Sequence, residues 1–128
     1  ISLAKKVSQT SKKAVFTFGP DDAMSKDYIC SKVDFEVEIF DSKMTLFEFT
    51  KYIASSYIFI STSTGPMHLA GATNTKTISF FGDSLFASSK RWATISEEKN
   101  QNNFMLSSDY TKEEYNKIEN CLMGILND

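Results

Sequence analysis

Residues 61–70 read STSTGPMHLA and join two different apolar patterns. The run before them, YIFI at residues 57–60, is β-branched and aromatic and predicts a buried strand. A helical apolar pattern begins at Pro66, and proline suits the first helical position because its missing N–H needs no partner there. The stretch therefore predicts a strand, a tight turn and a helix.

This turn has the composition of an anion-binding turn. With Thr64 as the helix cap, the N–H groups of residues 67–69 lack partners and face past the strand end, together with the positive end of the helix dipole. Gly65 lets an anion approach the backbone without meeting a Cβ, and the hydroxyls of residues 61–64 can donate to phosphate oxygens. The alternative is that these residues only cap the helix, as in most such turns.

His68 has two interpretations. A ring in the first helical turn can donate a hydrogen bond to the same anion, whereas a lone histidine near a helix start is often a hydrogen-bonded structural residue. A metal site is not predicted, because one histidine, the distant Cys30 and Cys121, and no tight carboxylate cluster leave no ligand set. We expect neither a cofactor nor an obligatory metal.

Composition limits the class of protein. The chain has 128 residues, of which 41% are hydrophobic and 23% charged, and we expect one globular domain over residues 1–128. A net charge of −2 argues against non-specific nucleic-acid binding, and no stretch is long and apolar enough to span a membrane. The two cysteines lack CxxC spacing, which favours a reducing compartment. Because the chain starts at Ile1 with what resembles a helix end, we expect a piece of a longer protein.

Strand-like runs recur about every twenty residues, the spacing of βα units in a parallel sheet. They cover residues 14–18, 35–40, 57–60, 77–81 and 104–106. Acidic residues open a predicted helix at 23–31. The pattern predicts an α/β fold, with a mostly parallel sheet flanked by helices.

Two further helices begin with a capping box, in which a threonine hydroxyl and a glutamate carboxylate bond each other's N–H groups. The boxes are Thr45 with Glu48, and Thr111 with Glu114. Helical spacing predicts which apolar residues pack inward. In the first helix these are Leu46, Phe49 and Ile53; in the second they are Tyr115, Ile118, Leu122 and Ile125.

Other strand ends carry candidate ligand residues, because ligands of open α/β sheets bind at the carboxyl ends of the strands. Asp21 and Asp22 follow the first strand; a carboxylate there can hold a ribose diol, although helix capping is the alternative. Lys43 and Met44 follow the second strand. Their alternatives are an ordinary solvated lysine and a methionine that packs at the helix entry.

These residues resemble those of a known family. Residues 63–70, STGPMHLA, followed by ISFFG at 78–82, resemble the donor-domain signature of heptosyltransferase-like enzymes, glycosyltransferase family nine. The FGPDD turn at 18–22 and KMTL at 43–46 also look like that family's, in the same order. Four pieces in order are more specific than an isolated TGxxH motif.

The resemblance implies a fold and a function. The fold would be the Rossmann-like, carboxy-terminal half of a two-domain glycosyltransferase of the GT-B type. Donor diphosphate would bind Ser63, Thr64, Gly65, Pro66, Met67 and His68. The nucleoside would contact Asp21, Lys43 and Met44. The family is expected to transfer heptose from ADP-heptose to a lipopolysaccharide or lipooligosaccharide core without an obligatory metal. It uses a carboxylate base in the amino-terminal domain, so no catalytic residue is expected in this chain, which alone would be inactive.

The sequence departs from the family pattern at Ser63, where an aspartate is usual, so another nucleotide sugar is an alternative donor. We expect a bacterial cytoplasmic protein. Peripheral association of the full protein with the inner membrane is compatible with this expectation. Two other functions stay open: a nucleotide- or phosphate-binding module of different activity, and a degenerate domain that binds a partner.

Overall fold

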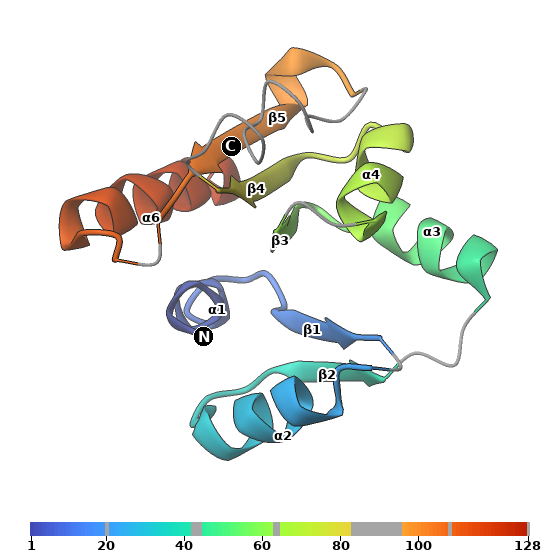
Figure 1. Cartoon of the computed structure of the whole chain (residues 1–128), viewed down its shortest axis with the longest axis horizontal. Coiled ribbons are helices and arrows are strands. Elements are labelled where there is room, and N and C mark those ends of the chain that lie inside the picture. Colours follow the sequence, from blue (N-terminus) through green and yellow to red (C-terminus); the bar gives the residue numbers. More distant parts are fainter. Residues whose placement is uncertain (20, 42–44, 63–64, 83–95, 108, 128) are drawn as a thin grey trace. The chain divides into compact units, whose positions relative to one another are not determined.

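The computed structural model describes residues 1–19, 21–41, 45–62, 65–82, 96–107 and 109–127. The chain forms two compact units, Ile1–Met44 and Thr45–Asp128 (Figure 1). Each unit has its own parallel sheet, so the predicted class, α/β with parallel strands flanked by helices, is confirmed. A single nucleotide-sugar-binding domain over residues 1–128 stays a prediction.

The first unit pairs two short parallel strands. In order, it contains α1 (Ser2–Ser8), β1 (Val15–Phe18), α2 (Ala23–Lys32) and β2 (Glu38–Asp41). Val15 pairs with Glu38 and Phe18 with Asp41. The strand β2 starts at Glu38, three residues later than the alternating pattern predicted, so only its last part joins the ladder.

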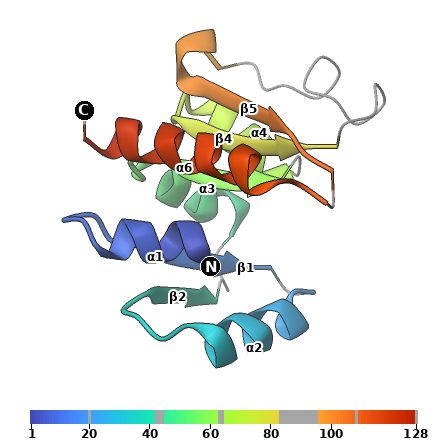
Figure 2. The same ribbon diagram turned by 90° about the vertical axis from the view of Figure 1, so that its left-hand side faces the viewer.

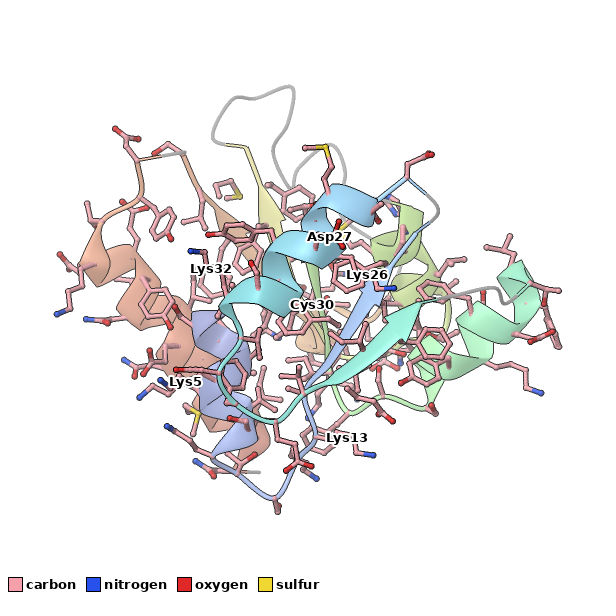
Figure 3. The ribbon with its side chains drawn as sticks, turned by 90° about the horizontal axis from the view of Figure 1, so that it is seen from below. Lys5, Lys13, Lys26, Asp27, Cys30 and Lys32 are labelled. Carbon is pink, nitrogen blue, oxygen red and sulfur yellow. The ribbon has the colours of Figure 1, made fainter. Side chains whose placement is uncertain are left out.

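Helix α2 has no fully buried residue and carries charges of both signs. Figure 3 shows Lys26, Asp27, Cys30 and Lys32 along this helix. Elsewhere in the unit, Lys13 forms an exposed ion pair with Glu38 at 3.6 Å. The described surface of this unit therefore mixes cations with carboxylates.

The second unit is a three-stranded parallel sheet, in the order β3-β4-β5. Its elements are α3 (Leu46–Ala54), β3 (Phe59–Thr62), α4 (Gly65–Ala72), β4 (Thr77–Phe81), the 3-10 helix η1 (Glu98–Asn100), β5 (Gln101–Met105) and α6 (Lys112–Leu126). The bounds of β4 are those predicted, whereas β3 lies two residues later and β5 starts three residues earlier. All three strands are parallel, so their carboxyl ends form one edge of the sheet.

The two faces of this sheet pack against different helices. Asn102 pairs with Ile78 and therefore shares its face, and Cys121 of α6 donates a weak hydrogen bond to Asn102 Oδ1 at 3.5 Å. Figure 2 shows α6 in front of β4 and α4 behind it. The opposite face, with the small side chain of Ser79, therefore meets the small residues of α4.

Both predicted threonine caps form. The Thr45 hydroxyl accepts a hydrogen bond from the N–H of Glu48 at 3.2 Å, and Thr111 does the same for Glu114 at 3.1 Å. In neither box does the glutamate carboxylate reach the threonine N–H within the described structure; that of Glu114 accepts from the Thr111 hydroxyl instead, at 3.4 Å. Each box is therefore half formed.

The prediction of which apolar residues pack inward is only partly correct. Ile53, Ile118 and Leu122 are buried. Leu46 is 71% exposed because it lies two turns before Ile53, where α3 extends past the packed region. In α6, Leu126 is buried in place of Ile125, so the core contacts continue in steps of four residues.

A hydrogen-bonded clasp closes the amino edge of this sheet. Asn74, with φ of 56°, ends the turn after α4; its amide donates to Glu97 Oε1 at 3.1 Å and its Oδ1 accepts from the Glu97 N–H at 3.0 Å. Lys99, 2.9 Å from the carboxylate, and Asn74 together lower the pKa of Glu97 from its ordinary value of 4.5. The clasp joins the segments that lead into β4 and β5.

Candidate functional site

The predicted strand and helix are present at the carboxyl edge of the second unit. Strand β3 ends at Thr62, next to Phe80 of β4, and α4 follows. The helix begins at Gly65, one residue earlier than predicted, so Pro66 is its second residue. Ser63 and Thr64, the predicted cap and hydroxyl donors, lie outside the described residues.

The earlier helix start changes which backbone N–H groups are free. Pro66 has no N–H, and the N–H of Leu69 falls within the helical pattern that begins with the Gly65 carbonyl. Among the described residues of the first turn, Gly65 and Met67 therefore have N–H groups without a helical partner, and no described residue accepts a hydrogen bond from either. Met67 is fully buried, whereas Gly65 is exposed. The start of α4 thus offers the Gly65 amide and the positive end of the helix dipole.

The side chains of this turn divide between core and solvent. Met67 is fully buried as a whole residue, with Ala70 and Gly71 on the same inward side, so neither its side chain nor its N–H is exposed to solvent. His68 is exposed, and no described residue hydrogen-bonds its ring. No contact within the described part of the chain supports the alternative that His68 is a hydrogen-bonded structural residue.

Gly65 leaves open space beside its own exposed N–H. Its φ is not positive, so the backbone does not require glycine. A Cβ built on Gly65 would meet no atom within 4 Å among the described residues beyond its own helical turn. The fold therefore tolerates a side chain at this position, and the absence of one leaves room for an anion to approach.

In the turn after β1 in the first unit, a carboxylate of the chain itself binds the strand-end N–H. Asp22 Oδ2 accepts a hydrogen bond from the Gly19 N–H at 2.7 Å. Asp22 is at the cap position of α2, as predicted, but its carboxylate bonds this strand-end amide and not the helix. Asp21 is exposed and has no hydrogen-bond partner among the described residues, so its role toward a ribose stays a prediction.

A carboxylate that we did not predict lies near the carboxyl edge, after β5. The Ser107 hydroxyl donates to Asp109 Oδ1 at 2.7 Å, and this bond lowers the pKa of Asp109. Strand β5 is two strands from β3, or about 10 Å. A negative charge here disfavours an anion at the β5 end of the sheet. The signal in the sequence was an acidic residue just after a strand.

The structure brings Gly65, Pro66, Met67 and His68 together in one helical turn. Asp21 belongs to the other unit, and Lys43 and Met44 lie outside the described residues. Within the described ranges, no three metal-binding side chains come together, and no helix has the length and apolar character of a membrane span. Among the described candidate residues, those of this turn include a hydrogen-bond donor that has no described partner and is exposed to an anion.

Known proteins resemble this chain in sequence and in fold. A family model described as glycosyltransferase family 9 (heptosyltransferase) matches residues 2–122. A Haemophilus influenzae protein named "Putative glycosyltransferase" is 34% identical over 84 residues, which make up 65% of this chain and 24% of that protein. The chain therefore spans about a quarter of the length of this relative.

Two solved structures share the fold. E. coli heptosyltransferase WaaC with ADP has a TM-score of 0.72 at 17% identity, over 94% of this chain and 37% of its own. The glycosyl transferase family 9 protein from Veillonella parvula has a TM-score of 0.70 at 14% identity, over 98% of this chain and 38% of its own.

Proposed function

Because this chain belongs to glycosyltransferase family 9, the heptosyltransferase family, we propose that it is the donor-binding part of a glycosyltransferase. The donor is ADP-heptose and the acceptor a lipopolysaccharide or lipooligosaccharide core. In this proposal the chain supplies the carboxy-terminal half of a two-domain GT-B enzyme, and the acceptor binds the other half. The cytoplasmic location expected from the sequence, and peripheral membrane contact of the full protein, belong to the same proposal.

The open first turn of α4 is the observation that carries the proposal. The exposed Gly65 N–H, which has no partner among the described residues, the space beside Gly65 and the exposed His68 suit the diphosphate of a nucleotide sugar. The ADP named with the E. coli heptosyltransferase structure supports a nucleotide diphosphate as the ligand class. Ser63 and Thr64 would add hydroxyl donors, and Asp21, Lys43 and Met44 would contact the nucleoside.

The proposed reaction is an inverting sugar transfer without an obligatory metal. An acceptor hydroxyl oxygen attacks the anomeric carbon, its proton passes to a carboxylate base in the amino-terminal half, and the bond from that carbon to the diphosphate oxygen breaks. Negative charge grows on the departing diphosphate. The Gly65 amide, the helix dipole and the His68 ring stabilise that charge.

Titration calorimetry on the full-length protein tests the donor class. We expect ADP to bind more tightly than UDP or GDP, and acceptor-dependent release of ADP from ADP-heptose. Tighter binding of UDP or GDP would replace ADP-heptose with another nucleotide sugar. Absence of binding to all three nucleotides would contradict the donor-binding function and favour a degenerate, partner-binding domain.

A further inference from the structure

An exposed aromatic ring begins helix α3. Phe47 is 73% exposed and its neighbour Leu46 is 71% exposed, whereas Ile53, two turns later, is buried. The Lys51 ammonium lies over the Phe47 ring, 5.5 Å from its centroid. This cation–π contact covers one face of the ring and favours one ring orientation. The pair therefore holds a positive charge over one face of a ring that is otherwise largely exposed.

The position of this pair relates it to α4. Helix α3 leads through a short loop into the amino end of β3, and α4 leaves the carboxyl end of the same strand. The two helices contact each other (Figure 1). Both run back against the strand direction, so both begin toward the carboxyl edge. Helical side chains lean toward the amino end of their helix, which directs Phe47 toward that edge.

The same unit contains another exposed aromatic ring in a cation–π contact with a lysine, at the opposite edge of the sheet. Lys76 is over the Tyr57 ring, 5.9 Å from its centroid, and the Tyr57 hydroxyl donates to the Ile125 carbonyl at 3.2 Å. Tyr57 lies two residues before β3 and Lys76 one residue before β4, which places both at the amino edge of the sheet. Tyr57 is thus a matched control for Phe47.

We propose that Phe47 stacks on the base of the nucleotide donor through the ring face that Lys51 does not cover, with the Lys51 ammonium adding positive charge nearby. The inference rests on the proposed function, because it assigns the base of the ligand whose diphosphate binds at α4. A ring and a cation together complement a ligand that has an aromatic base and phosphate charge. Base–aromatic stacking is strong enough to affect nucleotide affinity measurably.

The test compares ADP with inorganic pyrophosphate on the full-length protein, using calorimetry. Phe47→Leu keeps an apolar side chain without a π face, and Phe47→Tyr keeps the ring. We expect Phe47→Leu to weaken ADP binding at least about fivefold and to leave pyrophosphate binding unchanged. Phe47→Tyr should stay within about twofold of wild type, as should Tyr57→Leu.

The outcomes separate the two proposals. If wild type binds ADP and Phe47→Leu binds it equally well, the stacking role is overturned while the donor-binding function stands. Equal losses for ADP and pyrophosphate would also overturn it, since the base would not be the group recognised. If wild type binds neither ligand, the donor-binding function itself fails.

Discussion

Substitution of Gly65 tests the anion cradle directly. A side chain at this position would stand beside the exposed N–H group of Gly65, where we place the diphosphate. The described residues leave room for it, since none beyond the same helical turn has an atom within 4 Å of the Cβ position, and φ is not positive. Gly65→Ala should therefore fold normally, and it removes a glycine from a helix, where glycine costs up to about 1 kcal/mol relative to alanine.

The expected loss of affinity follows from the bonds that the new side chain obstructs. A hydrogen bond to a charged group contributes about 1.5 to 3 kcal/mol. Loss of one such bond to phosphate corresponds to about ten- to a hundredfold weaker ADP binding. We expect Gly65→Val to exceed tenfold, or about 1.4 kcal/mol, because its branched side chain obstructs more of the approach than alanine does.

Gly124 supplies the matched control for Gly65. It is exposed in α6, and a Cβ there also meets nothing within 4 Å. Gly124→Ala should raise the thermal midpoint slightly and leave ADP affinity unchanged. Calorimetric titration with ADP, together with thermal unfolding of each variant, gives both quantities. A folded Gly65→Val protein with wild-type affinity would refute the assignment of this turn to the diphosphate.

Three other substitutions probe the second unit. His68→Ala should weaken ADP binding by about 1.5 to 3 kcal/mol in the same titration, and an accompanying loss of folding would support the structural interpretation. Ser79→Ala should preserve or raise urea resistance, because its buried hydroxyl has no hydrogen-bond partner in the described structure; a loss above about 1 kcal/mol would reveal a partner. Glu97→Gln should be less stable than wild type at neutral pH. The lowered pKa of Glu97 means that its contribution is present above about pH 4.5 and is lost as pH falls through the lower folded value, so thermal midpoints of the two proteins should converge in acid; a constant difference would contradict this.

The sequence predicts the elements of this fold better than their ends. Strand β4 is located to the residue because its five residues form a nearly continuous buried run between polar turns. The start of α4 is missed by one residue because a glycine gives no propensity signal for a first helical position. The prediction that Leu46 packs inward is wrong for a different reason. Helical spacing identifies the face that turns inward, but it does not show where the core ends along the helix axis.

The sequence likewise predicts some features of the candidate site and not others. A glycine, a proline and a histidine after a buried strand were enough to indicate the start of α4. Local pattern could not show that the carboxylate of Asp22 would bond Gly19, because either acidic residue could have reached the helix. Nor could it show Phe47 exposed beside Lys51, since an aromatic residue in a first helical turn can equally well pack inward.

The clasp between Asn74 and Glu97 lies at the edge of the sheet opposite the start of α4. Under the proposed function, the rigidity of this unit and its choice of ligand depend on separate sets of residues. Variation at the proposed ligand edge would then change which sugar nucleotide is accepted without altering the bonds that hold β4 and β5 in place. Such a division would let an enzyme of this kind acquire new donors by a few substitutions, and it indicates where libraries for redirecting donor choice should begin.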